Sequence, residues 1–253
     1  MKIGYLTGSQ GFKQDRPTVV FIHGAGGTGW SWMGLLSAVG RQVNTLALDL
    51  PGHGETPGPP LDSIEGYAEW LDRALKELRS EVGLDRFILA GHSMGGAISQ
   101  VFDLAHPNRA AGLALIGTGA ELPVNPRLLE GLLTDFDKTA ALVNNWCFAK
   151  DDQALREESL KLMLKAGPEA LFADFTACSR FSAVDRIGRI AKPTLIIVGE
   201  EDKMTPVEMS KFLEERIRSG SLEIVPGAGH MVMVEQPRVV IGLLTSFADR
   251  VFG

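Results

Sequence analysis

One serine in this chain stands at the end of an apolar run, with glycine two positions before it and two positions after it. Ser93 occupies the centre of residues 91–95, which fit the pattern G-x-S-x-G. A sharp turn from a strand into a helix needs small residues at both glycine positions, because larger side chains would collide there. Such a turn holds the serine oxygen out at the edge of a sheet. The pattern therefore predicts that Ser93 is a catalytic nucleophile.

Two further side chains, His230 and Asp202, could supply what a serine nucleophile needs. A serine hydroxyl requires a base within hydrogen-bond reach, and the base requires an acid that orients it. His230 follows the last predicted strand, at the same sheet edge as Ser93, and is the best candidate base. Asp202 follows the preceding strand and is the expected acid, with Glu200 and Glu201 of the same loop as alternatives. The order Ser93, Asp202, His230 is the chain order of nucleophile, acid and base that accompanies this turn.

A glycine-rich segment at residues 23–27, His-Gly-Ala-Gly-Gly, follows the first long apolar run. Glycines let backbone N–H groups approach a substrate oxygen, so we expect the N–H groups of Ala25 and Met94 to form an oxyanion hole. The alternative use of such a segment is phosphate binding. No Gly-Lys-Ser/Thr ending follows it, however, and its glycine spacing departs from the dinucleotide-binding pattern. We therefore do not expect this segment to bind a nucleotide.

The remaining histidines are expected to have no part in the chemistry. His23 is expected to order its own loop, His92 to point away from the nucleophile, His53 to be solvated, and His106 to be structural. Because no pair of histidines has metal-ligand spacing together with a carboxylate, no metal site is expected.

The elements that must position these residues are short apolar runs that alternate with helical patterns. The predicted strands are residues 18–23, 44–50, 86–90, 112–116, 193–198 and 221–225. Near-continuous apolar runs are typical of parallel strands covered on both faces, and alternation with helices favours right-handed crossovers. We predict an α/β fold with a mostly parallel, twisted sheet flanked by helices. Residues 1–7 and 11–13 are expected to add an antiparallel hairpin at one edge.

The alternation stops between residues 121 and 188, where only helical patterns occur. A stretch this long is not a simple loop in a compact domain. We therefore expect residues 121–188 to form a helical cap, or lid, inserted into a core made of residues 1–120 and 189–253. The candidate substrate-binding residues are four aromatic side chains, for which ordinary packing is the alternative: Trp30, Trp32, Trp146 and Phe148.

Composition limits the partners and the compartment. The chain has 253 residues, a formal net charge of −6 and 45% hydrophobic residues. Its charges are scattered without a basic run, which argues against nucleic acid or an anionic membrane as a partner. The N-terminus has no apolar signal-peptide core and no segment is apolar enough to span a bilayer, so a cytoplasmic protein is expected. Cys147 and Cys178 are expected to be free, buried thiols.

Five segments, in their order along the chain, together resemble the α/β-hydrolase superfamily. They are HGAGG at 23–27, DLPGHGET at 49–56, GHSMGG at 91–96, GEED at 199–202 and PGAGHM at 226–231. Within the superfamily the chain is similar to small, lidded carboxylesterases, enol-lactonases, cofactor-free haloperoxidase-like proteins and C–C bond hydrolases. Haloalkane dehalogenases and epoxide hydrolases of this fold are excluded, because they use an aspartate at the position of Ser93.

The resemblance implies a sheet of about eight strands, a helical cap and an acyl-serine cycle without a cofactor. It implies a serine esterase that cleaves small to medium, largely apolar carboxylic esters with the triad Ser93, Asp202 and His230. A lactonase, thioesterase or C–C bond hydrolase with the same triad is the first alternative. A slow-turnover small-molecule receptor on the same scaffold is the second. The expected partner is a small-molecule ester, and the sequence leaves a homodimer open.

Overall fold

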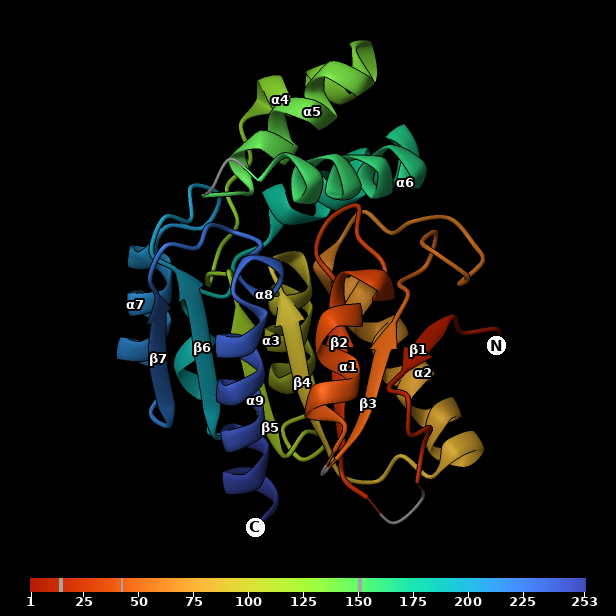
Figure 1. The fold of residues 1–253 in the computed structure, drawn as a ribbon, viewed down its shortest axis with the longest axis vertical. Helices are drawn as coiled ribbons and strands as arrows, with labels where there is room; N and C mark the ends of the chain where they lie inside the picture. The colour runs from red at the N-terminus through yellow and green to blue at the C-terminus, as the bar shows by residue number, and fades with distance from the viewer. Residues whose placement is uncertain (14–15, 42, 150–151) are drawn as a thin grey trace.

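A sheet between two layers of helices forms the body of the protein in a computed structural model, which describes residues 1–13, 16–41, 43–149 and 152–253 (Figure 1). The sheet contains seven strands in the described residues, in the order β1-β3-β2-β4-β5-β6-β7. The strands are β1 (Tyr5–Thr7), β2 (Thr18–Ile22), β3 (Asn44–Leu48), β4 (Phe87–His92), β5 (Gly112–Ile116), β6 (Thr194–Gly199) and β7 (Gly220–Val225). Only β1 pairs antiparallel within this described sheet. The predicted mostly parallel sheet is confirmed, with one strand fewer than the expected eight or so.

The predicted N-terminal hairpin is wrong. β1 pairs with β3, with Tyr5 opposite Leu48, and residues 11–13 form no strand. The backbone of Lys13 is instead bonded to the Asn44 side chain: the Lys13 N–H donates to Asn44 Oδ1 at 2.9 Å, and Asn44 Nδ2 donates to the Lys13 carbonyl at 2.7 Å. The open edge of β3 offers β1 a full ladder of backbone partners, which a two-stranded hairpin would have left unused.

Alternate side chains of the buried strands enter two separate cores. The core helices are α1 (Met33–Val39), α2 (Ile64–Val82), α3 (Met94–Ala105), α7 (Val207–Arg216), α8 (Val232–Glu235) and α9 (Pro237–Phe252), with short 3-10 helices at Gly29–Trp32 and Ile187–Arg189. In β2, Val19 and Phe21 pack toward α1 and α9, while Val20 and Ile22 pack toward α2 and α3. Because both faces are covered, the strands read as continuous apolar runs instead of alternating ones.

A helical insertion, residues 126–180, lies between β5 and β6 and covers one edge of the sheet (Figure 1). It consists of α4 (Pro126–Thr134), α5 (Phe136–Trp146) and α6 (Gln153–Arg180), and residues 150 and 151 of the expected cap lie outside the described residues. Gly167, with φ 85° and ψ 170°, and Pro168 break α6 into two parts. The insertion has a small apolar core of its own. No helix of the described chain is long and apolar enough to cross a membrane.

Candidate active site

Ser93 lies in the turn between β4 and α3 with a strained backbone. Its φ is 52° and its ψ is −117°, and it is the one non-glycine residue with positive φ in the described chain. A Cβ on Gly91 would collide with the backbone of Gly95, and a Cβ on Gly95 would collide with the carbonyl of Ile22. Both positions therefore require glycine. The Ser93 N–H donates to the carbonyl of Ile116 at 2.9 Å, which holds the turn against the neighbouring strand β5.

His230 and Asp202 face each other in the loops that follow β7 and β6. His230 Nδ1 lies 2.9 Å from Asp202 Oδ2, and both side chains are buried. Asp202 also accepts hydrogen bonds from the N–H groups of Met204 and Thr205 and from Thr205 Oγ1, each at 2.8 Å. Burial opposes the charged form of Asp202, but His230 and these hydrogen bonds outweigh it and lower its pKa. Asp202 is therefore a carboxylate that orients the His230 ring.

The two alternative acids lie elsewhere. Glu200 and Glu201 are exposed, whereas Asp202 is buried against His230. Thr205, which sequence analysis did not select, is part of the same hydrogen-bonded group as Asp202. Its signal in the sequence was weak, because a threonine before a proline and a helix reads equally well as an ordinary helix start.

We had expected His92 to point away from the nucleophile, and this expectation is wrong. His92 lines the same cavity as Ser93 and His230, and its Nε2 lies 3.0 Å from the carbonyl oxygen of His230. Burial and the neighbouring His230 lower the pKa of His92 to about 3, so the ring is neutral and donates from Nε2. The residue before the serine thus holds the backbone of the candidate base.

The glycine-rich segment after β2 forms a tight turn beside Ser93. The Gly27 N–H donates to the Gly24 carbonyl at 3.0 Å, and Gly26 has φ 65°. Ala25 lies at the corner of this turn. Within the described chain no hydrogen bond takes up the N–H of Ala25 or that of Met94, the first residue of α3. Two unpaired donors at a helix start and a glycine turn suit a developing negative charge on a substrate oxygen.

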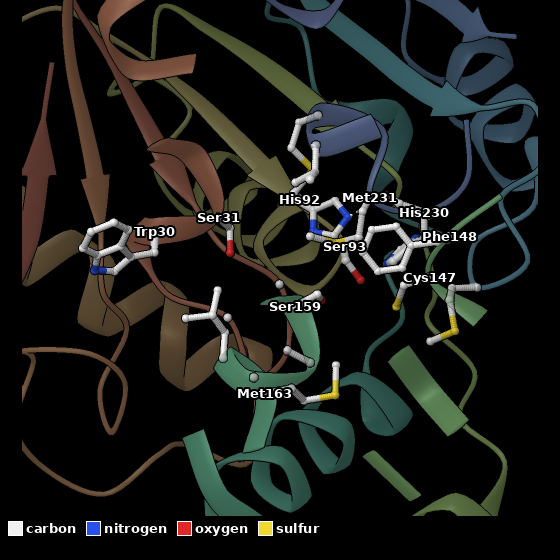
Figure 2. Close-up of a pocket in the computed structure, with 18 of the residues that line it drawn as sticks. Trp30, Ser31, His92, Ser93, Cys147, Phe148, Ser159, Met163, His230 and Met231 are labelled. Carbon is white, nitrogen blue, oxygen red and sulfur yellow. Dashed lines mark hydrogen bonds between the residues drawn. The ribbon is translucent and has the colours of Figure 1, made fainter. Parts of the chain in front are cut away.

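Ser93, His92 and His230 line a cavity of about 280 Å³ between the sheet edge and the insertion. Figure 2 shows them grouped on one side of it, with Ser159 and Met163 of α6 on the other. The lining is mostly apolar and includes Val143, Phe148, Leu162, Met163, Met231 and Met233. No Lys or Arg of the described chain lines it, and its one carboxylate, Glu158, is 70% exposed. The cavity therefore suits a small, uncharged and largely apolar ligand.

The four predicted aromatic residues divide into two pairs. Phe148 and Trp30 line the cavity, with Phe148 buried and Trp30 largely exposed at the side away from Ser93 (Figure 2). Trp32 and Trp146 do not line it, so their assignment to the pocket is corrected. Trp32 is buried in the core, where its ring centroid lies 4.8 Å from that of Phe21. Trp146 is the last residue of α5 and is 39% exposed.

The expectation that His53 is solvated is wrong. His53 is only 2% exposed, and its Nε2 lies 3.0 Å from Oδ2 of Asp174, a buried residue of α6. His23 does order its own loop, as predicted: its Nδ1 lies 2.8 Å from the Gly24 carbonyl, and the Leu50 N–H donates to its Nε2. Asp174 was missed because no motif surrounds it, and its partners come from distant parts of the chain.

Both cysteines are free and buried, as predicted, and both line the cavity. Burial is the main cause that raises the pKa of the Cys147 thiol to about 12, and burial also raises the pKa of Cys178. Neither is a thiolate at neutral pH, so neither is a nucleophile of this site. In the described part of the chain, no group of three or more His, Cys, Asp and Glu side chains is placed to hold a metal ion.

A strand-to-helix serine turn, a histidine–aspartate pair and a helical insertion over a parallel sheet define a hydrolase architecture. The family model described as "Alpha/beta hydrolase family" matches residues 19–243, and the chain belongs to this family.

Three proteins illustrate what this chain resembles in sequence and in fold. The 2-hydroxy-6-oxo-2,4-heptadienoate hydrolase of Pseudomonas putida is 30% identical over 248 residues, which cover 90% of this chain and 88% of the relative. The solved structure of a thermophilic esterase has a TM-score of 0.85 and 33% identity, and the match covers 98% of this chain and 94% of the esterase. The enol-lactonase of Burkholderia xenovorans LB400 has a TM-score of 0.87 at 19% identity, over 98% of this chain and 96% of the lactonase, and shows the shared fold.

Proposed function

We propose that this protein is a serine esterase that cleaves small to medium, uncharged carboxylic esters through an acyl-enzyme. The observation that carries the proposal is the contact of His230 with Asp202 at 2.9 Å, because His230 lines the same mostly apolar cavity as Ser93. Ser93 is the nucleophile, His230 the general base and acid, and Asp202 the residue that orients the imidazole.

In the first half of the reaction Ser93 Oγ attacks the ester carbonyl carbon while His230 takes the hydroxyl proton. The carbonyl oxygen becomes an oxyanion, which the N–H groups of Ala25 and Met94 stabilise. The imidazolium of His230 is stabilised by the Asp202 carboxylate, whose lowered pKa keeps it charged. His230 then gives the proton to the leaving alcohol, and the acyl group remains on Ser93.

In the second half a water molecule attacks the acyl carbon, with His230 again as the base. The same two N–H groups stabilise the second oxyanion, and its collapse releases the acid and restores the Ser93 hydroxyl. Both halves need the same donors, so the geometry of the glycine turn at Gly24–Ala25–Gly26–Gly27 affects acylation and deacylation alike.

The charge of the cavity favours an ester over the substrate named for the Pseudomonas relative. A dienoate carries a carboxylate, and a carboxylate in an apolar site needs a cationic partner. No Lys or Arg of the described chain lines the cavity. A lactone or a thioester is neutral and fits the same lining, so these substrates belong in the test.

The test is hydrolysis of p-nitrophenyl esters of increasing acyl length by the wild type, by Ser93→Ala and by Ser210→Ala. Ser210 is a matched control, because its hydroxyl is buried on α7 without a hydrogen-bond partner in the described chain. We expect turnover by the wild type and by Ser210→Ala, and its loss in Ser93→Ala. If the wild type cleaves only lactones, only thioesters or only dienoates, the esterase proposal is refuted and the protein is an enzyme of the reaction class observed. Binding of an ester without turnover would identify a receptor and refute the enzyme.

A further inference from the structure

A second buried carboxylate lies close to the proposed oxyanion hole but outside the triad. Asp174, on α6, has no exposed surface. Its two oxygens accept hydrogen bonds from three segments that are far apart in the sequence. Oδ2 accepts from the Gly26 N–H at 2.8 Å and lies 3.0 Å from His53 Nε2, and Oδ1 accepts from the Tyr67 hydroxyl at 2.6 Å.

We propose that Asp174 is a positioning residue that holds the oxyanion turn, residues 24–27, in its active geometry from the helical insertion. The proposal rests on the function proposed above, since it assigns to the turn a part in stabilising the oxyanion. Asp174 is not a catalytic residue, because it acts on the turn and not on the substrate.

The contact with Gly26 fixes one peptide unit of the turn. The Gly27-to-Gly24 hydrogen bond closes the turn, and the positive φ of Gly26 at the third position requires one orientation of the Ala25–Gly26 peptide. The N–H of that peptide points at Asp174 and is buried. Without the Asp174 acceptor this N–H would be buried and unpaired, and the hydrogen bond that favours this orientation of the peptide would be lost. Ala25, which carries a proposed oxyanion donor, lies directly before it.

Packing holds the same turn against the same helix. A Cβ on Gly26 would collide with the side chain of Leu171, which lies three residues before Asp174 on α6. Phe175 and Cys178 on this part of α6 also line the cavity. The segment that closes the cavity therefore also supplies the acceptor for the turn, so closure of the cavity and ordering of the turn depend on the same contacts.

The partners of Asp174 hold its side chain in place. His53 Nδ1 lies 3.0 Å from the Pro51 carbonyl, so both ring nitrogens of His53 face oxygen atoms, an arrangement that favours the protonated ring. Burial lowers the pKa of His53, but the attraction and hydrogen bond of Asp174 outweigh it, and the pKa is raised. The Tyr67 hydroxyl occupies the other oxygen and itself accepts from the Leu61 N–H at 3.1 Å.

The experiment compares Asp174→Asn with Asp103→Asn in the full chain. Asp103 is a matched control: it is a buried carboxylate on α3, and its Oδ1 has no hydrogen-bond partner within the described chain. The first measurement is amide hydrogen exchange of peptides that cover residues 23–28. The second is kcat and KM for the best p-nitrophenyl ester, with the melting temperature as a check on folding.

We expect faster exchange in the turn and a fall in kcat of about 10-fold to 100-fold for Asp174→Asn, with KM within about 3-fold of the wild type. Asp103→Asn should leave both the exchange and kcat at wild-type values. Unchanged exchange, an unchanged kcat, or equal losses in both variants would overturn the proposal. If Asp174→Asn does not fold, Tyr67→Phe removes one donor to the same carboxylate and should shift both readouts in the same direction by a smaller factor, and wild-type readouts in that variant would overturn the proposal.

The two proposals fail in different ways. A wild type without turnover on any ester would refute the esterase, while hydrogen exchange would still decide whether Asp174 holds the turn. An active wild type with an active Asp174→Asn variant would refute the positioning role alone.

Discussion

The Nε2–H of His92 donates to the backbone carbonyl of His230 at 3.0 Å. This contact joins the end of β4, directly before Ser93, to the loop that carries the candidate base, although His92 and His230 are 138 positions apart in the sequence. The ring centroids of the two histidines are 4.6 Å apart. The relative placement of the serine turn and the base therefore depends on a neutral histidine as well as on the Asp202 carboxylate.

Replacement of His92 by alanine should lower both stability and turnover. The His230 carbonyl would lose its donor in a buried site, which costs about 1–3 kcal/mol of the free energy of unfolding. We expect kcat to fall by at least about 10-fold, because the backbone of His230 would no longer be held in a fixed position relative to Ser93. Urea unfolding and steady-state kinetics check the two effects. Wild-type kcat in a destabilised His92→Ala would show that His92 is structural only.

Replacement of Asp202 by asparagine should remove most of the activity, by about 10⁴-fold, because an amide in place of the carboxylate favours the wrong tautomer of the base and cannot stabilise its imidazolium. The chain offers two matched controls, Glu200→Gln and Glu201→Gln, which change exposed carboxylates of the same loop. Both should keep wild-type kcat. Loss of activity in one of the controls, with Asp202→Asn active, would transfer the role of the acid to that glutamate.

Replacement of Ser93 by glycine should stabilise the protein while it abolishes turnover. The backbone of Ser93, with φ 52° and ψ −117°, is in a region that glycine adopts readily and other residues avoid. Relief of this strain should raise the free energy of unfolding by about 1–2 kcal/mol. Ser93→Ala keeps the backbone strain and loses the hydroxyl. It should therefore be inactive and should not show the higher free energy of unfolding. Equal melting temperatures for the two variants would argue against strain at this turn.

The His53–Asp174 pair should make stability depend on pH in a known direction. The pKa of His53 is raised above its ordinary value of 6.5 by Asp174, against burial. Its contribution to stability is therefore fully present below the unfolded pKa and is lost as the pH rises through the folded pKa. Each unit of the raised pKa corresponds to about 1.4 kcal/mol.

The comparison of the wild type with His53→Gln by urea unfolding tests this dependence. The difference in stability between them should be largest below the ordinary histidine pKa of 6.5 and should shrink as the pH rises above it. Asp174 and Asp49 are the charges that favour the imidazolium, and His23, with a pKa lowered to about 4 by burial and by His53, remains neutral throughout. A difference that does not change with pH would mean that His53 is neutral in the folded protein.

Local sequence was enough for the serine turn. Gly91 and Gly95 are required by backbone contacts within a few residues and with the adjacent strand, and an apolar run before the serine with a helix after it defines the geometry. The central strands β2 to β6 were equally predictable, because coverage on both faces makes them continuously apolar. The number of strands and the pairing of the N-terminal strand were harder to predict. An edge strand can pair with any neighbouring strand that has unpaired backbone N–H and C=O groups.

The sequence by itself determined the fold class, the serine turn, and the set of loops that meet at one sheet edge, because parallel strands bring their carboxyl ends together whatever their side chains. Only the tertiary structure decided that Asp202, and not Glu200 or Glu201, is buried against His230. Only the structure shows that Trp32 and Trp146 do not line the pocket. Only the structure shows that Asp174 contacts Gly26, which is 148 positions away in the sequence. The physical reason is the same in each case: burial and through-space hydrogen bonds depend on how distant segments pack, and spacing along the chain carries no record of that packing.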